Sequence, residues 1–165
     1  MSLELKIGVA PLHDERRLCF SKPEDLREVL KKYPLDKGFI DYVRDNGFKI
    51  FYEKDIPVGY GAVVYYSKEL EELGHHSHII CLGIGNRGNI DNKGELSEDE
   101  KKLIDLTLIH ELVHIAIPDW RLTWRCQVPF IYKMFDKVID EIAEEYLKDK
   151  DFLDYVKKTI PFEKN

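Results

Sequence analysis

The segment His110-Glu111-Leu112-Val113-His114 carries the side-chain types of a metal-dependent hydrolytic site. Histidines four residues apart lie on the same face of an α-helix, so both imidazoles can bind one ion. A catalytic zinc ion needs nitrogen or anionic ligands and one position left open to water. Glu111 is placed to take a proton from that water, whose pKa zinc lowers towards about 7. The pattern therefore predicts a zinc site with Glu111 as general base.

This motif resembles that of the zincin metallopeptidases, which place an HExxH helix under a small sheet. The resemblance covers the succession of short strands, glycine-rich loop, motif helix and second helix over residues 48–148, and only the five-residue motif is specific. It implies a zinc ion on His110 and His114, Glu111 as general base and acid, and hydrolysis of a peptide bond.

The third protein ligand distinguishes the branches of these enzymes. The branch with the longer motif HExxHxxGxxH is excluded, because Ile117 and Trp120 occupy the places of its glycine and third histidine. The gluzincin branch takes a glutamate from the following helix, often followed four residues later by an acid that supports a ligand histidine. Residues 140–145 are similar to that pattern, which implies Glu141 as the ligand and Glu145 as the supporting carboxylate.

A helical wheel is consistent with this choice, because Glu145 falls within the apolar sector of its helix and Glu141 at the margin. The ordinary alternative is a solvated acidic helix face. Another register of the gluzincin pattern makes Asp140 the ligand and Glu144 its follower, but an aspartate has the shorter reach. Asp119 is a further possibility, disfavoured by its closeness to the motif.

Two long helices are expected to position these residues. Ser97 and Glu100 form a capping box, and the first helix continues to about residue 117, where Pro118 forbids its continuation. After an irregular segment, Pro129 opens an amphipathic helix to about Lys148, with apolar residues recurring three and four apart.

Shorter elements precede and follow these helices. The alternation of residues 3–9 predicts a strand, and further strands are expected over residues 48–52, 60–66 and 78–84. Shorter helices are expected over residues 21–33, 35–45, 67–73 and 151–158, the first opened by Ser21 with Glu24 and the second closed by Asn46-Gly47. The expected fold is one α+β domain over residues 1–165, with a small mixed sheet on the motif helix and the second long helix supplying the third ligand.

Composition narrows the partners and the compartment. Acidic residues outnumber basic ones, 31 to 25, and the net charge of −6 argues against a nucleic-acid partner. No apolar run is long enough for a transmembrane helix, and the N-terminus lacks the apolar region of a signal peptide. Cys19, Cys81 and Cys126 are odd in number and far apart, which favours reduced thiols. We expect a cytoplasmic protein without a membrane partner, and its oligomeric state is left open.

Several further polar groups are weaker candidates. His75, His76 and His78 are a conceivable second metal site, although such a segment is more often solvated. In zincins the strand before the motif helix often holds extended substrate by strand addition, which implies this role for residues 78–84. Gly83 and Gly85 would allow a close approach of the substrate backbone. Candidates for stabilising an oxyanion are the tyrosines Tyr60, Tyr65, Tyr66, Tyr132 and Tyr146.

The sequence thus predicts zinc-dependent hydrolysis of a peptide or protein substrate. The alternative is a zinc-binding or regulatory module that keeps His110 and His114 but does not catalyse a reaction. These two functions differ in what Glu111 does, since only an enzyme needs it for turnover.

Overall fold

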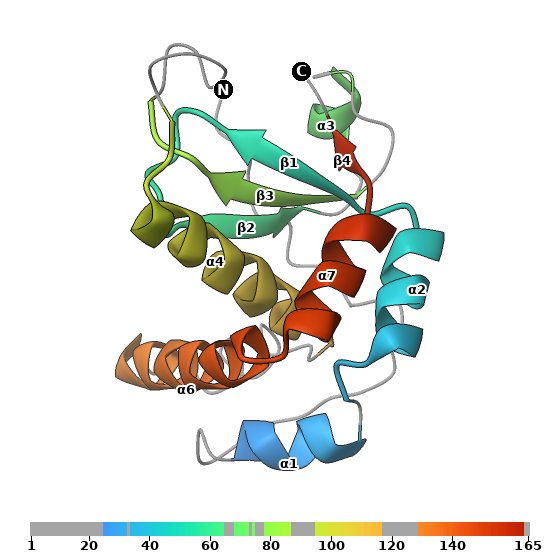
Figure 1. Ribbon diagram of the computed structural model, residues 1–165, viewed down its shortest axis with the longest axis vertical. Helices are drawn as coiled ribbons and strands as arrows, with labels where there is room; N and C mark the ends of the chain where they lie inside the picture. Colours follow the sequence, from blue (N-terminus) through green and yellow to red (C-terminus); the bar gives the residue numbers. More distant parts are fainter. Residues whose placement is uncertain are drawn as a thin grey trace.

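The computed structural model describes residues 25–32, 34–64, 68–72, 74, 78–86, 95–116 and 129–163. These residues form a mixed α+β fold with a four-stranded sheet (Figure 1). In chain order the elements are α1 (Asp25–Lys32), α2 (Lys37–Asp45), β1 (Lys49–Glu53), β2 (Gly61–Val64), α3 (Lys68–Glu72), β3 (Ile79–Gly83), α4 (Glu98–Ala116), α6 (Pro129–Leu147), α7 (Lys150–Thr159) and β4 (Phe162–Glu163).

The sheet has the strand order β2-β3-β1-β4. β1 pairs in parallel with β3, Phe51 opposite Cys81, and in parallel with β4 on its other side. β2 pairs with β3 in the antiparallel direction, Ala62 opposite Cys81. β3 is buried along its whole length, as expected for a continuous apolar run with strands on both sides. β2 therefore lies at one edge of the described sheet.

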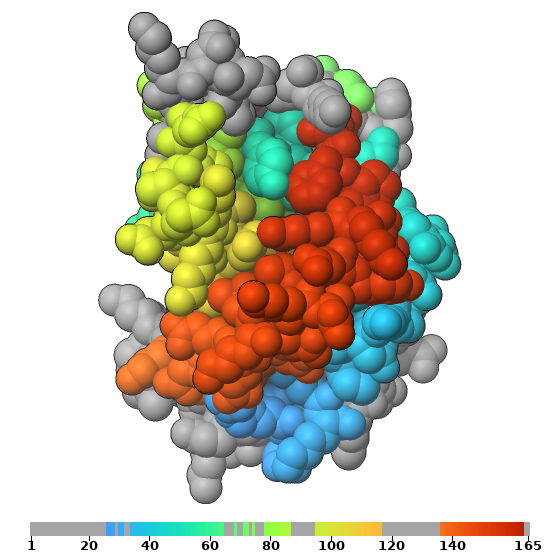
Figure 2. All heavy atoms as spheres, viewed as in Figure 1, coloured from blue at the N-terminus to red at the C-terminus, as the bar shows by residue number. Residues whose placement is uncertain are grey.

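Helices build the main core on one face of this sheet. α4 packs against β2 and β3, α6 packs against α4, and α1 and α7 contact α6 (Figure 1). Buried side chains on α4, such as Ile109, Leu112 and Val113, point in several directions because the helix lies between the sheet and α6. Figure 2 shows α6 and α7 (orange to red) through the middle and lower part of the molecule, with α4 (yellow) above α6 at the left. An ion pair of 2.8 Å between Lys157 and Asp105 joins α7 to α4.

Most predicted elements are present within the described residues. The capping box of α4 is formed as expected: the Ser97 amide donates to Glu100 and the Glu100 amide donates to the Ser97 hydroxyl, both at 3.1 Å. Gly47 adopts a φ of 85° directly after α2, which confirms the predicted left-handed stop. β4 was not predicted, because two residues carry too little periodicity to indicate a strand.

Some predictions lie outside the described residues. These are the strand over residues 3–9, the capping pair Ser21 and Glu24, most of the glycine-rich loop, and Cys19 and Cys126. Cys81 is described and is a buried free cysteine. Within the described part of the chain, no helix combines the length and apolar character needed to cross a membrane. The single domain over residues 1–165 stays a prediction.

Candidate metal centre

The two histidines of the motif point their rings towards the same place on α4. The Nε2 atoms of His110 and His114 lie 2.9 Å apart, and the ring centroids are 4.7 Å apart. Both side chains are largely buried, with 16% and 20% of their surface exposed. The four-residue spacing thus produces the predicted convergence of two imidazoles.

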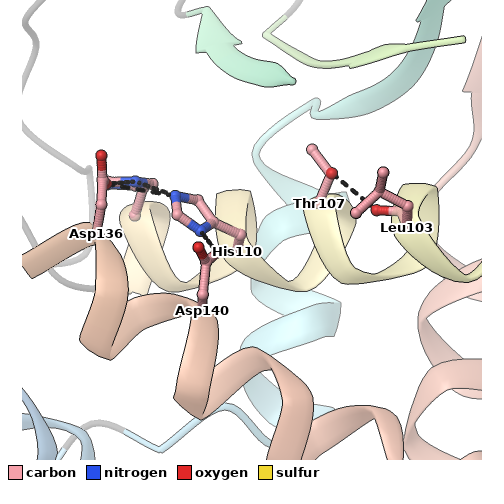
Figure 3. A network of polar contacts seen from close by, with 6 residues as sticks. Leu103, Thr107, His110, Asp136 and Asp140 are labelled. Carbon is pink, nitrogen blue, oxygen red and sulfur yellow. Dashed lines mark hydrogen bonds and ion pairs between the residues drawn. The ribbon is translucent and has the colours of Figure 1, made fainter. Parts of the chain in front are cut away.

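Asp136 on α6 completes a group of three possible ligands (Figure 3). Its Oδ1 atom lies 3.6 Å from Nε2 of His110 and 3.8 Å from Nε2 of His114. Zinc–ligand bonds of about 2.0–2.1 Å in a tetrahedron place ligand atoms about 3.4 Å apart. The three distances of 2.9, 3.6 and 3.8 Å fall around this value, so the cluster could hold a metal ion with little movement.

Asp140, one helical turn after Asp136, fixes the orientation of the first histidine. Its Oδ1 atom lies 2.6 Å from Nδ1 of His110 (Figure 3). A neutral His110 that donates its Nδ1 proton to Asp140 keeps Nε2 available as an acceptor towards the cluster. Carboxylates on the outer nitrogen of a ligand histidine fix the tautomer and make the ligand more basic.

The same two aspartates control the protonation of His110 when no metal is bound. Burial disfavours the charged ring, but the hydrogen bonds with Asp136 and Asp140 and the nearby charge of Glu111 outweigh it. Together they raise the pKa of His110 to about 10. The surroundings of His110 therefore stabilise a positive charge on its ring.

Glu111 lies on the side of α4 that faces β2. Its side chain is buried, at 7% exposure, and a Cβ atom built on Gly61 would lie 3.3 Å from its Oε1 atom. Burial, followed by the charges of Glu53 and Glu111, raises the pKa of Cys81 in β3 to about 12. The carboxylate thus lies close to β2, and its charge acts on both His110 and Cys81.

The structure does not bring Glu141 to the histidines. Glu141 lies 3.9 Å from Arg27 of α1, and Glu145 lies 3.0 Å from the same guanidinium. Both acids are exposed, so the assignment of Glu141 as ligand and Glu145 as its support disagrees with this arrangement. The reason is helical geometry: five residues rotate a side chain by about 140°, which turns Glu141 away from the face that holds Asp136.

Asp136 was not among the predicted site residues, although its spacing from Asp140 is visible in the sequence. Asp136 and Asp140 are four residues apart, like the two histidines, and so share one face of α6. Of the other candidates, Asp140 is present at the site as a partner of His110 rather than as one of the three clustered ligands. Glu144 is exposed, and Asp119 lies outside the described residues.

β3, the strand predicted to bind substrate by strand addition, lies inside the sheet and has no open edge. β3 has β2 and β1 on its two sides, so its backbone is already paired, and β2 is the edge strand. A Cβ atom at Gly83 would lie 2.3 Å from the Pro57 carbonyl oxygen, so the chain's own turn makes the close approach there. The fully buried pattern of β3 indicates an interior strand.

The remaining polar candidates do not gather at the cluster within the described residues. Tyr60 is exposed, and the ring of Tyr146 packs against Phe152 of α7. His78 contacts Phe48, and burial lowers the pKa of its ring. The structure does not describe the side chains of the other candidate tyrosines and histidines, namely Tyr65, Tyr66, Tyr132, His75 and His76.

Comparison with known proteins finds no relative: no family model, no curated protein and no solved structure matches the chain. What the site can do therefore follows from its own residues and geometry.

Proposed function

We propose that this chain is a zinc-dependent peptide hydrolase with His110, His114 and Asp136 as metal ligands and Glu111 as general base. The observation that carries the proposal is the convergence of two Nε2 atoms and one carboxylate oxygen, within 3.8 Å of one another, next to a buried glutamate. The gluzincin spacing supports it as well, since the acid on the second helix is followed four residues later by one that contacts a ligand histidine.

Three protein ligands leave the fourth position of a tetrahedral ion to water or substrate. A bound zinc ion would supply Lewis acidity to a carbonyl oxygen and lower the pKa of water. His110 and His114 bind as neutral imidazoles, and Asp136 contributes the negative charge. Asp140 holds His110 in the tautomer with a free Nε2 and does not itself contact substrate.

Glu111 moves the proton in this reaction. As general base it takes a proton from the attacking water, and as general acid it returns a proton to the leaving amine. Its burial against Gly61 keeps the carboxylate in a region of low water content, where electrostatic effects are stronger than in bulk solvent.

The edge strand β2 offers a place for an extended peptide. The Gly83 amide donates to the Tyr60 carbonyl at 2.8 Å, which makes these two residues a hydrogen-bonded pair of the antiparallel ladder. Such pairs alternate, so the backbone groups of Gly61 and Val63 point away from β3. No other described strand pairs on that side. A peptide added there would pass next to Glu111.

A non-catalytic zinc-binding module remains the second candidate, and the burial of Glu111 favours it in one respect. A carboxylate with only 7% exposure would also suit a purely structural acid. One substitution separates the two functions, because a module of this kind has no hydrolysis to lose when Glu111 becomes glutamine.

The test combines metal content with turnover. Elemental analysis of protein purified without added zinc should give about one zinc per chain. Asp136→Asn should lower this content clearly, whereas the matched control Glu141→Gln should keep it. Glu111→Gln should retain zinc and lose hydrolysis of a mixed peptide pool. Hydrolysis by Glu111→Gln at the parental rate, or no zinc uptake by the parent after zinc addition, would overturn the proposal.

A further inference from the structure

Two large apolar side chains are exposed beside the edge strand. Tyr60 directly precedes β2 and is 66% exposed, and Leu103 on α4 is 39% exposed. Among the described residues, one further large apolar side chain is exposed, that of Tyr52. Tyr52 in β1 stacks on Phe162 in β4, towards the other edge of the sheet. Tyr60 and Leu103 differ from Tyr52 in lying beside β2, whose first residue, Gly61, is close to Glu111.

Leu103 lies on the part of α4 that runs beside β2, before the histidines. A Cβ atom built on Gly59 would lie 3.0 Å from Leu103, and one built on Gly61 would lie 2.7 Å from Thr107 and 3.3 Å from Glu111. β2 and α4 therefore run side by side in the same direction. Leu103 precedes His110 by seven residues, about 10 Å along the helix, which an extended chain covers in about three residues.

Tyr60 lies on the opposite face of the sheet. Gly61 faces α4, and successive residues of a strand point to opposite faces, so Tyr60 points away from α4. Ala62, two residues later, packs against the small cluster on that opposite face, as this alternation requires. A peptide paired with β2 alternates in the same way, so one of its side chains meets Leu103 and a neighbouring one meets Tyr60.

We infer that Leu103 and Tyr60 determine specificity for substrates with two neighbouring apolar residues about three positions from the cleaved bond. The occupant is an extended peptide segment, because only an extended chain reaches both faces of the edge and the outward-pointing backbone groups of Gly61 and Val63. This inference rests on the proposed function for the position of the cleaved bond, but binding of the apolar pair can be measured without turnover.

The experiment has a turnover arm and a binding arm. In the first, the zinc-loaded protein is incubated with a degenerate peptide pool, and cleavage sites are read by mass spectrometry. Apolar residues should be enriched at two neighbouring positions. Leu103→Gln and Tyr60→Ser should each remove the preference at one of them, with kcat/KM for an apolar peptide falling about tenfold and that for a serine-substituted peptide unchanged. Lys102→Gln, an exposed change one residue away on α4, is the matched control.

In the second arm, zinc-loaded Glu111→Gln protein binds a fluorescent apolar peptide and its serine-substituted version. Weaker binding of the apolar peptide after Leu103→Gln or Tyr60→Ser supports the inference even if the parent hydrolyses nothing, in which case the proposed function alone fails. Equal binding or cleavage of the two peptides, or no effect of either substitution, overturns the inference.

Discussion

The carboxylate of Asp140 lies 2.6 Å from Nδ1 of His110, which leaves Nε2 of the same ring to face His114 and Asp136. α6 thereby contributes two residues to the site: Asp136 lies beside the Nε2 atoms of both histidines, and Asp140 contacts Nδ1 of His110. The two aspartates stand one turn apart, and so do the two histidines on α4. The site is thus built from one turn on each of two packed helices.

Removing the carboxylate of Asp140 should weaken zinc binding without abolishing it. Asp140→Asn keeps the size of the side chain but can no longer accept from His110 as an anion, and loss of such a partner typically costs about 10- to 100-fold in metal affinity. Competition with a chelator of known affinity measures the change. Glu144→Gln, an exposed acid one turn further along α6, serves as control and should bind as the parent does.

The stability of the metal-free protein should fall as the pH rises above about 6.5. His110 has an ordinary pKa near 6.5 and a folded pKa of about 10, so its charged form is stabilised in the folded state. The stabilisation of the folded state by the charged His110 ring is fully present below pH 6.5. It is lost as the pH rises through about 10, the pKa in the folded state. Urea unfolding of chelator-treated protein at several pH values from about 6 to about 10 measures this decrease in the free energy of unfolding.

A His110→Gln variant lacks this titration and provides the comparison. Its free energy of unfolding should change less over the same pH range than that of the parent. An identical pH dependence in the two proteins would show that His110 does not bind a proton between Asp136 and Asp140 as described.

Zinc should reverse the effect of pH at the same site. Binding requires neutral imidazoles, so the ion competes with the proton on His110, and its affinity should increase with pH. A ligand that binds only the folded state raises stability by RT ln(1 + [L]/Kd), about 2.7 kcal/mol at a hundredfold excess over Kd. Thermal unfolding with and without zinc at two pH values measures both effects, and a zinc-induced shift that decreases with pH would contradict this expectation.

The ion pairs between α1 and α6 should contribute little to stability. Arg27, Glu141 and Glu145 are all more than a third exposed, and hydration and salt weaken such pairs. Glu141→Gln is therefore expected to change the free energy of unfolding by less than about 1 kcal/mol and to leave zinc content unchanged. Denaturant titration and elemental analysis test the two statements, and loss of zinc would restore Glu141 as a ligand.

Gly61 should tolerate no larger side chain. A Cβ atom there would lie 2.7 Å from both the Cys81 carbonyl oxygen and the Thr107 methyl group, so Gly61→Val would push β2 away from α4. Overpacking of this kind typically costs about 1–3 kcal/mol. Gly38→Ala in α2 is the contrasting change, because its nearest neighbour lies at 3.4 Å and alanine favours helix. Denaturant unfolding should show loss in the first variant and no loss in the second.

Local patterns in the sequence predicted the helices and the histidine pair, because both depend on spacing within one segment. Ser97 and Glu100 opened α4 as expected, and His110 and His114 converge as their four-residue spacing requires. The third member of the cluster depends on which face of α6 meets α4. That face is determined by packing between two helices, which a wheel of α6 alone does not describe. The wheel favoured Glu141, whereas Asp136 is the acid that lies at the histidines.

The position of β3 shows the same limit. Its apolar run predicted a buried strand, but the order of strands depends on contacts between distant segments. Substrate binding by strand addition was therefore assigned to residues 78–84, whereas the structure has β2 as the edge strand and β3 inside the sheet.

The pairing of β1 with β4 also constrains how the molecule is made. Ile50 donates its amide to the Pro161 carbonyl at 2.7 Å, across more than a hundred residues of chain. On the ribosome, β1 must wait with one side unpaired until α4, α6 and α7 have been synthesised. Since contacts of high sequence separation slow folding, completion of the sheet is expected to be a late step, after the helices that carry His110, His114 and Asp136 have formed.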